Sequence, residues 1–398
     1  MELARTPHRP DRRSESTPPL RGEASDRTHW LRTLGPGDWL FAATLVIGAF
    51  FALRRYGASM DVYDEGILLL HVPILCAIGW HWKAFRPFLA AVALLSLASI
   101  GLYQGNLARA EQAFLLKYLI SSQTAIMWMS ALMFMATGAY WLGLALRSDF
   151  ADKTGSALTW TATTMGTAGL FVRWYESYLI GPDIGHIPIS NLYEVFVLFS
   201  LMTALLYPYY ERSYATRRLG AFVLTVIAAA VAFLLWYTFS REAHQIQPLI
   251  PALQSYWMKI HVPTNFIGYG AFALSAMVGC AYLLVERGIL ASRLPPPRVL
   301  EDVMYKAIAI GFAFFTIATI LGALWAAEAW GTYWQWDPKE TWALIVWLNY
   351  AAWLHMRLTK GLRGSMLAWW SVIGLLVVSF AFLGVNMFLS GLHSYGSL

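Results

Sequence analysis

The chain has 398 residues, of which 58% are hydrophobic and 13% are charged, and its formal net charge is +6. Soluble domains average about 45–50% apolar and about 25% charged residues, so this composition excludes an ordinary soluble domain and indicates a protein embedded in membrane lipid. The positive charge does not indicate a nucleic-acid partner, because the 29 Lys and Arg residues lie mostly in short connecting loops and in the first 36 residues.

The N-terminal segment, residues 1–36, combines Arg, Pro, Ser and acidic residues with almost no apolar anchors. Such a composition cannot offset the entropy lost on ordering, so we expect a disordered cytoplasmic tail. The segment contains five acidic residues and no cleavage-type run. It therefore fits neither a transit peptide nor a removable signal peptide.

Apolar runs recur along the rest of the chain, each of about 17–25 residues and long enough to cross a hydrocarbon core of about 30 Å as a helix. The runs are continuous rather than alternating, which predicts an all-α, polytopic membrane helix bundle. The number of spans within residues 37–125 stays open. The eleven expected spans are 38–54, 66–82, 87–103, 125–146, 158–180, 189–209, 219–239, 262–285, 306–326, 341–358 and 366–389.

Basic residues in the loops predict the orientation of the spans. Lys and Arg concentrate in every second loop, and cytoplasmic loops of membrane proteins carry such an excess. We therefore expect a cytoplasmic N-terminus and a periplasmic C-terminus, with Arg54 and Arg55 as exceptions to the pattern. This orientation places the 240–261 loop, the Trp-rich 326–341 loop and the C-terminal tail on the same outer face.

The two cysteines, Cys76 and Cys280, both lie inside apolar runs, so no structural disulfide is expected. The sequence contains no CxxC pair, which excludes a c-type cytochrome and a thiol oxidoreductase of the CxxC kind. The chain is expected to act on such proteins rather than to be one.

An unusual concentration of tryptophans lies just before the span that begins near Thr341. Trp330, Trp334 and Trp336 are crowded into one loop beside Asp337. The tryptophans can form an interfacial belt, and Asp337 can simply cap the following helix. A belt, however, is spread over many spans. A crowded aromatic shelf suits a large planar apolar ligand with polar edges, and haem is such a ligand.

The loop resembles the tryptophan-rich WWD signature of haem-handling membrane proteins, over residues 330–344, which read WGTYWQWDPKETWAL. The half that reads DPKETWAL is similar to the CcsA/ResC branch of the system II cytochrome c biogenesis proteins. Residues 187–196, IPISNLYEVF, and the Leu-His-Met-Arg that ends at Arg357 agree with the same branch. The resemblance extends over about residues 160–396.

The resemblance implies a subunit of a cytochrome c synthase, and therefore part of a haem lyase complex. Such a subunit carries haem b as its transported substrate and presents it on the outer face of the bacterial inner membrane, for covalent attachment to the CxxCH motif of apocytochrome c. A CcsB/ResB-type membrane partner is also implied. On this basis the chain divides into N-terminal transmembrane segments, 37–157, and a haem-handling core, 158–398.

Histidine is the natural axial ligand of haem iron, because neutral imidazole supplies a suitable nitrogen. The resemblance implies that His261 and His393 are the two axial ligands of the haem on the outer face. From the residues alone, each would more often be an interfacial or capping histidine than a ligand. The resemblance implies that four further residues support and orient the haem ring: Trp330, Trp334, Trp336 and Asp337.

His355 differs, because it lies inside or at the cytoplasmic end of the span 341–358, where an ionisable side chain is costly and usually functional. The resemblance implies that it binds haem in transit, with a second ligand from the CcsB/ResB-type partner. An interhelical hydrogen bond is the alternative. The other candidates are His71 and His81 as substitute ligands, His186 and His244 as outer-face contacts, and Glu194 with Arg173 near a haem propionate.

Two alternatives to the synthase subunit remain open. One is a haem-delivery or lyase component of system I, CcmC-like or CcmF-like, although the chain length and the PKET sequence after Asp337 favour the CcsA/ResC branch. The other is a secondary transporter for a small solute. A transporter predicts broken helices and buried charges near mid-membrane in repeated halves, and these are not evident in the sequence.

Overall fold

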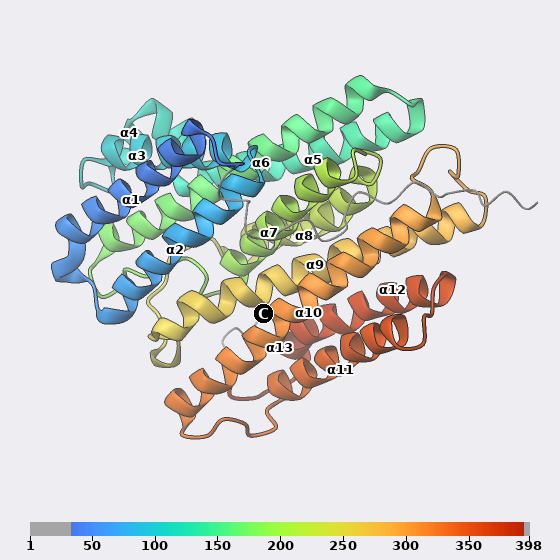
Figure 1. Ribbon diagram of the computed structural model, residues 1–398. Coiled ribbons are helices and arrows are strands. Elements are labelled where there is room, and N and C mark those ends of the chain that lie inside the picture. The colour runs from blue at the N-terminus through green and yellow to red at the C-terminus, as the bar shows by residue number, and fades with distance from the viewer. Residues whose placement is uncertain (1–32, 394–398) are drawn as a thin grey trace, which may run out of the picture. The chain divides into compact units, whose positions relative to one another are not determined.

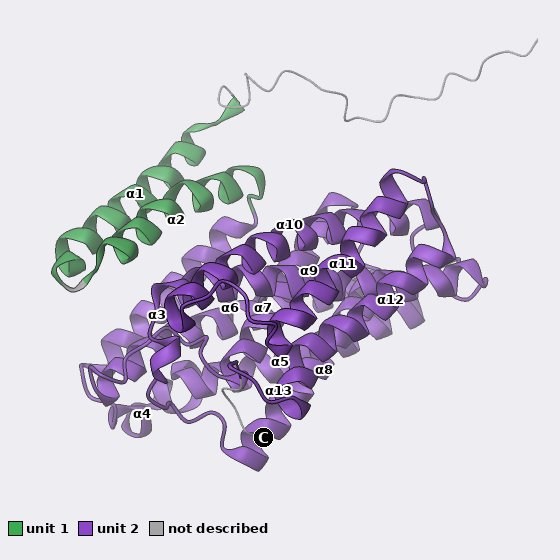
Figure 2. Cartoon of the chain, turned by 90° about the horizontal axis from the view of Figure 1, so that it is seen from below, with its two compact units in different colours: residues 1–83 green, residues 84–398 purple. Residues whose placement is uncertain are grey.

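A computed structural model describes residues 33–393, which form helices and connecting loops without a strand (Figure 1). This confirms the all-α expectation for the part of the chain that is described. The expected disordered tail, residues 1–36, lies outside the described residues except for its last four positions. The chain divides into two compact units, residues 1–83 and 84–398, coloured separately in Figure 2.

The first unit is a helical hairpin. Helix α1 (Pro36–Tyr56) is followed by a short 3₁₀ turn and by α2 (Val62–His81). The indole nitrogen of Trp80 donates to the carbonyl of Asp38 at 3.0 Å, and the Asp38 carboxylate pairs with Lys83. These contacts fix the antiparallel arrangement at the end where α1 begins and α2 ends.

The second unit contains the remaining long helices. A π-helical turn, η5 (Phe380–Gly384), interrupts the last of them. In chain order the elements are α3 (Phe85–Tyr103), α4 (Arg109–Gln112), η3 (Leu116–Ile120), α5 (Ser122–Leu146), α6 (Asp149–Ile180), α7 (Leu192–Ser213), α8 (Gly220–Arg241), η4 (Pro251–Leu253), α9 (Tyr256–Glu286), α10 (Pro297–Trp330), α11 (Pro338–Leu358), α12 (Ser365–Ser379), η5 (Phe380–Gly384) and α13 (Val385–Phe388).

Each of the eleven expected spans coincides with a long helix, or, for the last span, with the continuous run α12–η5–α13. Nine helices within residues 33–393 are long and apolar enough to cross a membrane, including α1, α2 and α3. Helices α6 and α11 are long enough but carry more charged and polar side chains, so they do not meet that criterion. The chain is a multi-pass membrane helix bundle.

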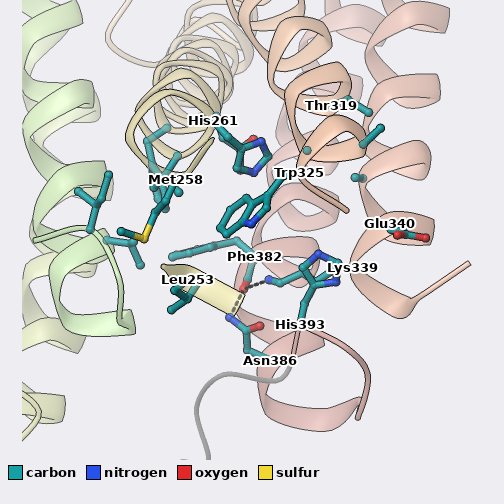
Figure 3. A pocket seen from close by; sticks show the side chains of 18 of the residues that line it. Leu253, Met258, His261, Thr319, Trp325, Lys339, Glu340, Phe382, Asn386 and His393 are labelled. Carbon is teal, nitrogen blue, oxygen red and sulfur yellow. Dashed lines mark hydrogen bonds between the residues drawn. The ribbon is translucent and has the colours of Figure 1, made fainter. Parts of the chain in front are cut away.

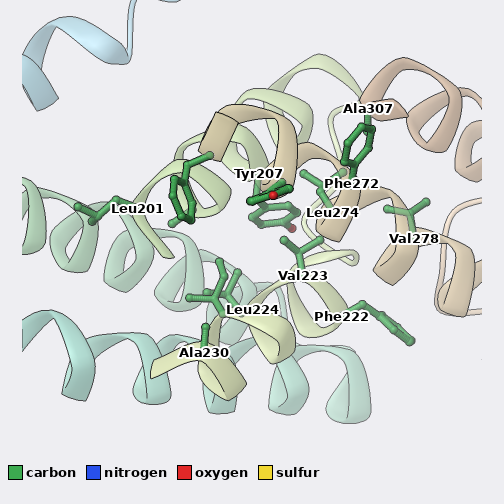
Figure 4. Close-up of a cluster of buried hydrophobic side chains, with 14 of the residues drawn as sticks. Leu201, Tyr207, Phe222, Val223, Leu224, Ala230, Phe272, Leu274, Val278 and Ala307 are labelled. Atoms are coloured by element: carbon green, nitrogen blue, oxygen red, sulfur yellow. The ribbon is translucent and has the colours of Figure 1, made fainter. Parts of the chain in front are cut away.

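Helix α9 is the centre of the second unit, with 78% of its most apolar segment buried. Small residues allow its neighbours to approach closely, as is usual in membrane bundles. A Cβ atom added at Gly279 would lie 2.9 Å from the carbonyl oxygen of Ala368 in α12. The ring of Phe272 stacks on Tyr350 of α11 at 3.6 Å, and Figure 4 shows Phe272 and Leu274 beside Tyr207, Val223 and Leu224 in this core. This packing holds the middle of α9, and His261 lies on the same helix nearer its N-terminus.

Candidate functional site

A cavity of about 250 Å³ lies where α7, α9, α10, α11 and the last helix meet the Trp-rich loop (Figure 3). Its walls are mainly aromatic and aliphatic, with a few polar groups, as in most sites for small organic ligands. The apolar lining residues include Leu253, Met258, Phe266, Tyr269, Phe315, Trp325, Trp330, Tyr333, Trp334 and Phe382. The polar lining residues include His261, Asn265, Lys339, Glu340, Asn386 and His393.

His261 enters the cavity from the second turn of α9. The helix begins early, at Tyr256, because the Ser255 hydroxyl accepts a hydrogen bond from the Trp257 amide at 3.3 Å. Nδ1 of His261 donates to the carbonyl of Ala318 in α10 at 2.8 Å. This bond fixes the orientation of the ring and makes Nε2 the nitrogen that can bind a metal.

The close approach of α9 and α10 at this point depends on a glycine. A Cβ atom added at Gly322 would lie 2.9 Å from Cε1 of His261. The indole of Trp325, one turn further along α10, meets the imidazole edge-to-face with 5.7 Å between ring centroids. The His261 ring is therefore confined from two sides.

His393 reaches the same cavity from the segment after α13. Its Nδ1 lies 2.8 Å from Oδ2 of Asp337, and its ring meets Trp330 with 4.6 Å between centroids. Burial holds the pKa of His393 below the usual value of 6.5, although the hydrogen bond to Asp337 opposes that shift. Burial thus favours the neutral imidazole, which is the form that binds iron.

Asp337 lies beside the cavity, at the N-terminus of α11. Asp337 is not among the described residues that line the cavity. Its carboxylate accepts hydrogen bonds from neighbouring groups instead. Oδ2 caps α11 by accepting from the Lys339 amide at 3.1 Å, and Oδ1 accepts from the Leu392 amide at 2.6 Å. The capping role that the sequence left open is therefore present, together with a contact that orients His393.

The three tryptophans of the loop are not equivalent. Trp330 and Trp334 line the cavity, as expected for an aromatic shelf. Trp336 does not line it. Its backbone adopts a left-handed conformation with φ of +58°, and its side chain is 67% exposed. Tyr333 lines the cavity and is also 64% exposed, so the cavity opens to the surface on this side of the loop.

His355 lies apart from this cavity, at the C-terminal end of α11. A helix rises about 1.5 Å per residue, so His355 is roughly 27 Å along the axis from Asp337 at the other end. Its side chain is exposed, and its ring lies 3.4 Å from the hydroxyl of Thr359. Within the described residues, no group of three or more His, Cys, Asp or Glu side chains forms a metal site.

Most of the other candidates named from the sequence have structural partners, whereas the buried Nδ1 of His244 has none among the described residues. Glu194 forms an ion pair with Arg173 at 2.8 Å, and these side chains are 1% and 3% exposed. His186 is buried, with its ring nitrogens beside the Ile184 carbonyl and the Ser190 hydroxyl. In the first unit, Nδ1 of His71 and of His81 lies within hydrogen-bonding distance of the carbonyl one turn earlier in α2.

Several residues of the site were not identified from the sequence. Lys339 lies in the Trp-rich segment, but a lysine is not a residue type that by itself indicates haem binding. Phe382 is one of many aromatic residues in an apolar span. Asn386 could have been noticed as an amide in an otherwise apolar run, because polar side chains in spans usually have a specific role. Trp325, one turn before Trp330, lies on the same helix as its cavity-lining neighbour.

Comparisons with known proteins show the family to which the chain belongs. A family model described as Cytochrome C assembly protein matches residues 189–393, which contain all the cavity-lining residues. The chain belongs to the cytochrome c assembly family. Its relatives in this family include the cytochrome c biogenesis protein CcsA of Chlorella vulgaris, 35% identical over 304 residues, which cover 67% of this chain and 94% of the relative. CcsA of Parasynechococcus marenigrum (strain WH8102) is 34% identical over 286 residues, which cover 65% of this chain and 90% of the relative.

These relatives confirm the expectation of a CcsA-type member of the cytochrome c assembly family. Among solved structures, the cytochrome c haem lyase CcmF matches with a TM-score of 0.53 and 16% identity, covering 66% of this chain and 46% of that chain. At this identity the match shows a shared fold. This chain spans under half the length of that protein.

Proposed function

We propose that this chain is the haem-carrying subunit of a cytochrome c synthase, and that the cavity holds haem between His261 and His393. The observation that carries the proposal is that both imidazoles line one aromatic cavity and both use Nδ1 in a hydrogen bond. In each ring, Nε2 is then the nitrogen suited to an axial position on iron. The membership of the chain in the cytochrome c assembly family supports haem as the ligand.

The proposed mechanism depends mainly on positioning. A thioether forms when a cysteine S–H of the CxxCH motif adds across a haem vinyl group, so sulfur bonds to one vinyl carbon and the proton goes to the other. No net oxidation or reduction accompanies this addition. The protein would hold the ring between Trp330 and Trp334 with its vinyl edge toward the open side near Tyr333, and so raise the effective concentration of the reacting groups.

The topology supports delivery on the outer face of the bacterial inner membrane. Basic residues in alternate loops predict that the Trp-rich loop and the segment after α13 lie outside the cytoplasm. His355, at the opposite end of α11, would then lie near the cytoplasmic side. We propose that it binds haem in transit, with the second ligand supplied by a CcsB/ResB-type partner, because its ring is exposed on the bundle surface.

The test is the visible spectrum of the chain purified with its membrane partner. We expect the Soret band and the reduced α and β bands of low-spin haem with two histidine ligands. A His355→Ala background isolates haem in the cavity from haem in transit. In that background, the double change His261→Ala and His393→Ala should abolish the low-spin spectrum, whereas His71→Ala on the exposed face of α2 should leave it intact. An unchanged spectrum in the double variant would overturn the ligand assignment.

A further inference from the structure

Lys339 is the only lysine or arginine among the described residues that line the cavity. Its ammonium donates to the carbonyls of Ala381 and Phe382 at 3.0 and 2.9 Å (Figure 3 shows the bond to Phe382). Ala381 is only 3% exposed, so the ammonium is held against a buried part of the last helix.

The carbonyls that hold Lys339 belong to the π-helical turn η5. In a π-helix the hydrogen bonds run to the fifth residue rather than the fourth, which displaces carbonyl oxygens from the regular α-helical pattern. The Phe382 oxygen accepts from the side chains of both Lys339 and Asn386, the latter at 3.1 Å. The last helix therefore offers Lys339 neutral acceptors and no negative charge.

The two nearby carboxylates accept hydrogen bonds from groups other than Lys339. Asp337 accepts from His393 and from the backbone of α11 and Leu392. Glu340 accepts from the amides of Gln335 and Asp337 at 2.7 and 3.2 Å, both through Oε2, whereas its buried Oε1 has no hydrogen-bond partner in the described residues. Neither forms an ion pair with Lys339 within 4.0 Å in the described residues. An ammonium has three donors, and two carbonyls account for two of them.

We infer that Lys339 binds a propionate carboxylate of the haem and so determines which edge of the ring faces outward. The inference rests on the proposed function, which places haem in this cavity. Thioether formation requires the vinyl edge to face the incoming CxxCH motif, and the propionates project from the other side of the porphyrin. A carboxylate enclosed in the cavity needs a cation beside it, because an unpaired buried charge is strongly unfavourable, and Lys339 is the lining residue that supplies one.

The competing explanation is that Lys339 only ties α11 to η5. Metal-free protoporphyrin IX and its dimethyl ester separate the two roles, because they differ only in the carboxylates and neither carries iron for His261 or His393 to bind. Tryptophan-fluorescence quenching of the haem-free complex gives a dissociation constant for each porphyrin. Detergent takes up the two porphyrins to different extents, but this affects all variants equally, so the ratio of the two constants is compared between variants.

We expect Lys339→Gln to lower the preference for the diacid over the diester by about tenfold or more relative to the unchanged chain. Lys339→Arg keeps the charge and should keep most of the preference. Asn386→Ala removes the other bond to the Phe382 carbonyl without removing a charge, so it should weaken both porphyrins equally. If Lys339→Gln also weakened binding of the diacid and the diester equally, the inference would be overturned. Lys339 would then serve only to link α11 to η5.

The porphyrin experiment can fail independently of the proposed function. If the haem spectrum did not depend on His261 and His393 but the porphyrin preference still fell in Lys339→Gln, the ligand assignment would be wrong and the carboxylate site would stand. If the spectrum depended on His261 and His393 as proposed but Lys339→Gln kept the preference for the diacid, the ligand assignment would stand and the carboxylate site at Lys339 would be wrong.

Discussion

Nδ1 of His393 lies 2.8 Å from Oδ2 of Asp337, although 56 positions separate the two residues in the chain. The contact joins the segment after the last helix to the N-terminus of α11. Asp337 also accepts from the Leu392 amide, so two adjacent residues of that segment are held by one carboxylate. In metal sites a carboxylate of this kind orients a histidine ligand and increases its basicity.

Replacing Asp337 tests this contact directly. Asp337→Asn keeps the size of the side chain but removes the charge that His393 contacts, and we expect haem affinity to fall about 10–100-fold. The measurement is absorbance titration of the haem-free complex. Asp61→Asn is the matched control, because Asp61 caps α2 in the same way and accepts from the Asp64 amide at 2.7 Å. Equal affinity in both variants would mean that Asp337 serves only as a helix cap.

Gly322 provides a second prediction. Gly322→Ala should displace the His261 ring, because the new methyl group would lie 2.9 Å from Cε1. Alanine favours a helix over glycine by about 1 kcal/mol, so the fold of α10 should not suffer. We expect the haem spectrum to change from low-spin toward high-spin. Gly138→Ala in α5 meets no atom within 4 Å and should leave the spectrum unchanged. A low-spin spectrum in Gly322→Ala would show that His261 does not ligate the iron.

The loop tryptophans should differ in their effect on haem binding. Trp334 lines the cavity, and its removal should lower haem affinity about tenfold or more, because a large aromatic contact is lost. Trp336 is 67% exposed and meets Trp334 edge-to-face at 5.8 Å, so Trp336→Ala should change affinity by less than about threefold. Titration with haem measures both. A larger loss in Trp336→Ala than in Trp334→Ala would contradict the cavity described above.

The buried ion pair between Arg173 and Glu194 gives a prediction for stability rather than ligand binding. Nη1 of Arg173 also donates to the His244 carbonyl at 2.7 Å, so the side chain joins α6, α7 and the loop after α8. Arg173→Met leaves a buried carboxylate unpaired, and we expect a loss of about 3–5 kcal/mol in the free energy of unfolding.

The measurement is the midpoint of thermal unfolding in detergent. Lys153→Met breaks an exposed pair with Asp149, and its midpoint should not change measurably. Haem affinity at low temperature should be the same in both variants, because neither Arg173 nor Lys153 lines the cavity. A specific loss of haem affinity in Arg173→Met would instead support a propionate role for this pair.

The positions of the helices were largely predictable from the sequence, because crossing a hydrocarbon core requires about 20 apolar residues. Their lengths were less so. Helix α6 begins at Asp149, before the expected start at 158, because the Ser148 hydroxyl caps it by accepting from the Ala151 amide at 3.3 Å. Hydropathy detects the apolar part of a helix, whereas capping residues decide where the helix actually begins.

The site was predictable in part. Loop orientation and the WWD resemblance pointed to His261, His393 and the Trp-rich loop, and the structure brings all three to one cavity. The outward position of Trp336 was not predictable, because it depends on a left-handed backbone that is rare for a large side chain. The contact of Lys339 with η5 was also hidden, since nothing in the apolar run around Phe382 signals a π-helical turn.

The two cavity histidines are separated in the chain by α10, α11, α12, η5 and α13. During synthesis on the ribosome, His261 is therefore made and inserted well before His393 exists. A nascent chain that has reached α11 already contains the Trp-rich loop, but Asp337 has no imidazole to orient and the cavity lacks one wall. The cavity is thus the last part of the bundle to be completed, so a chain released early could insert its helices and still be unable to retain haem between two histidines.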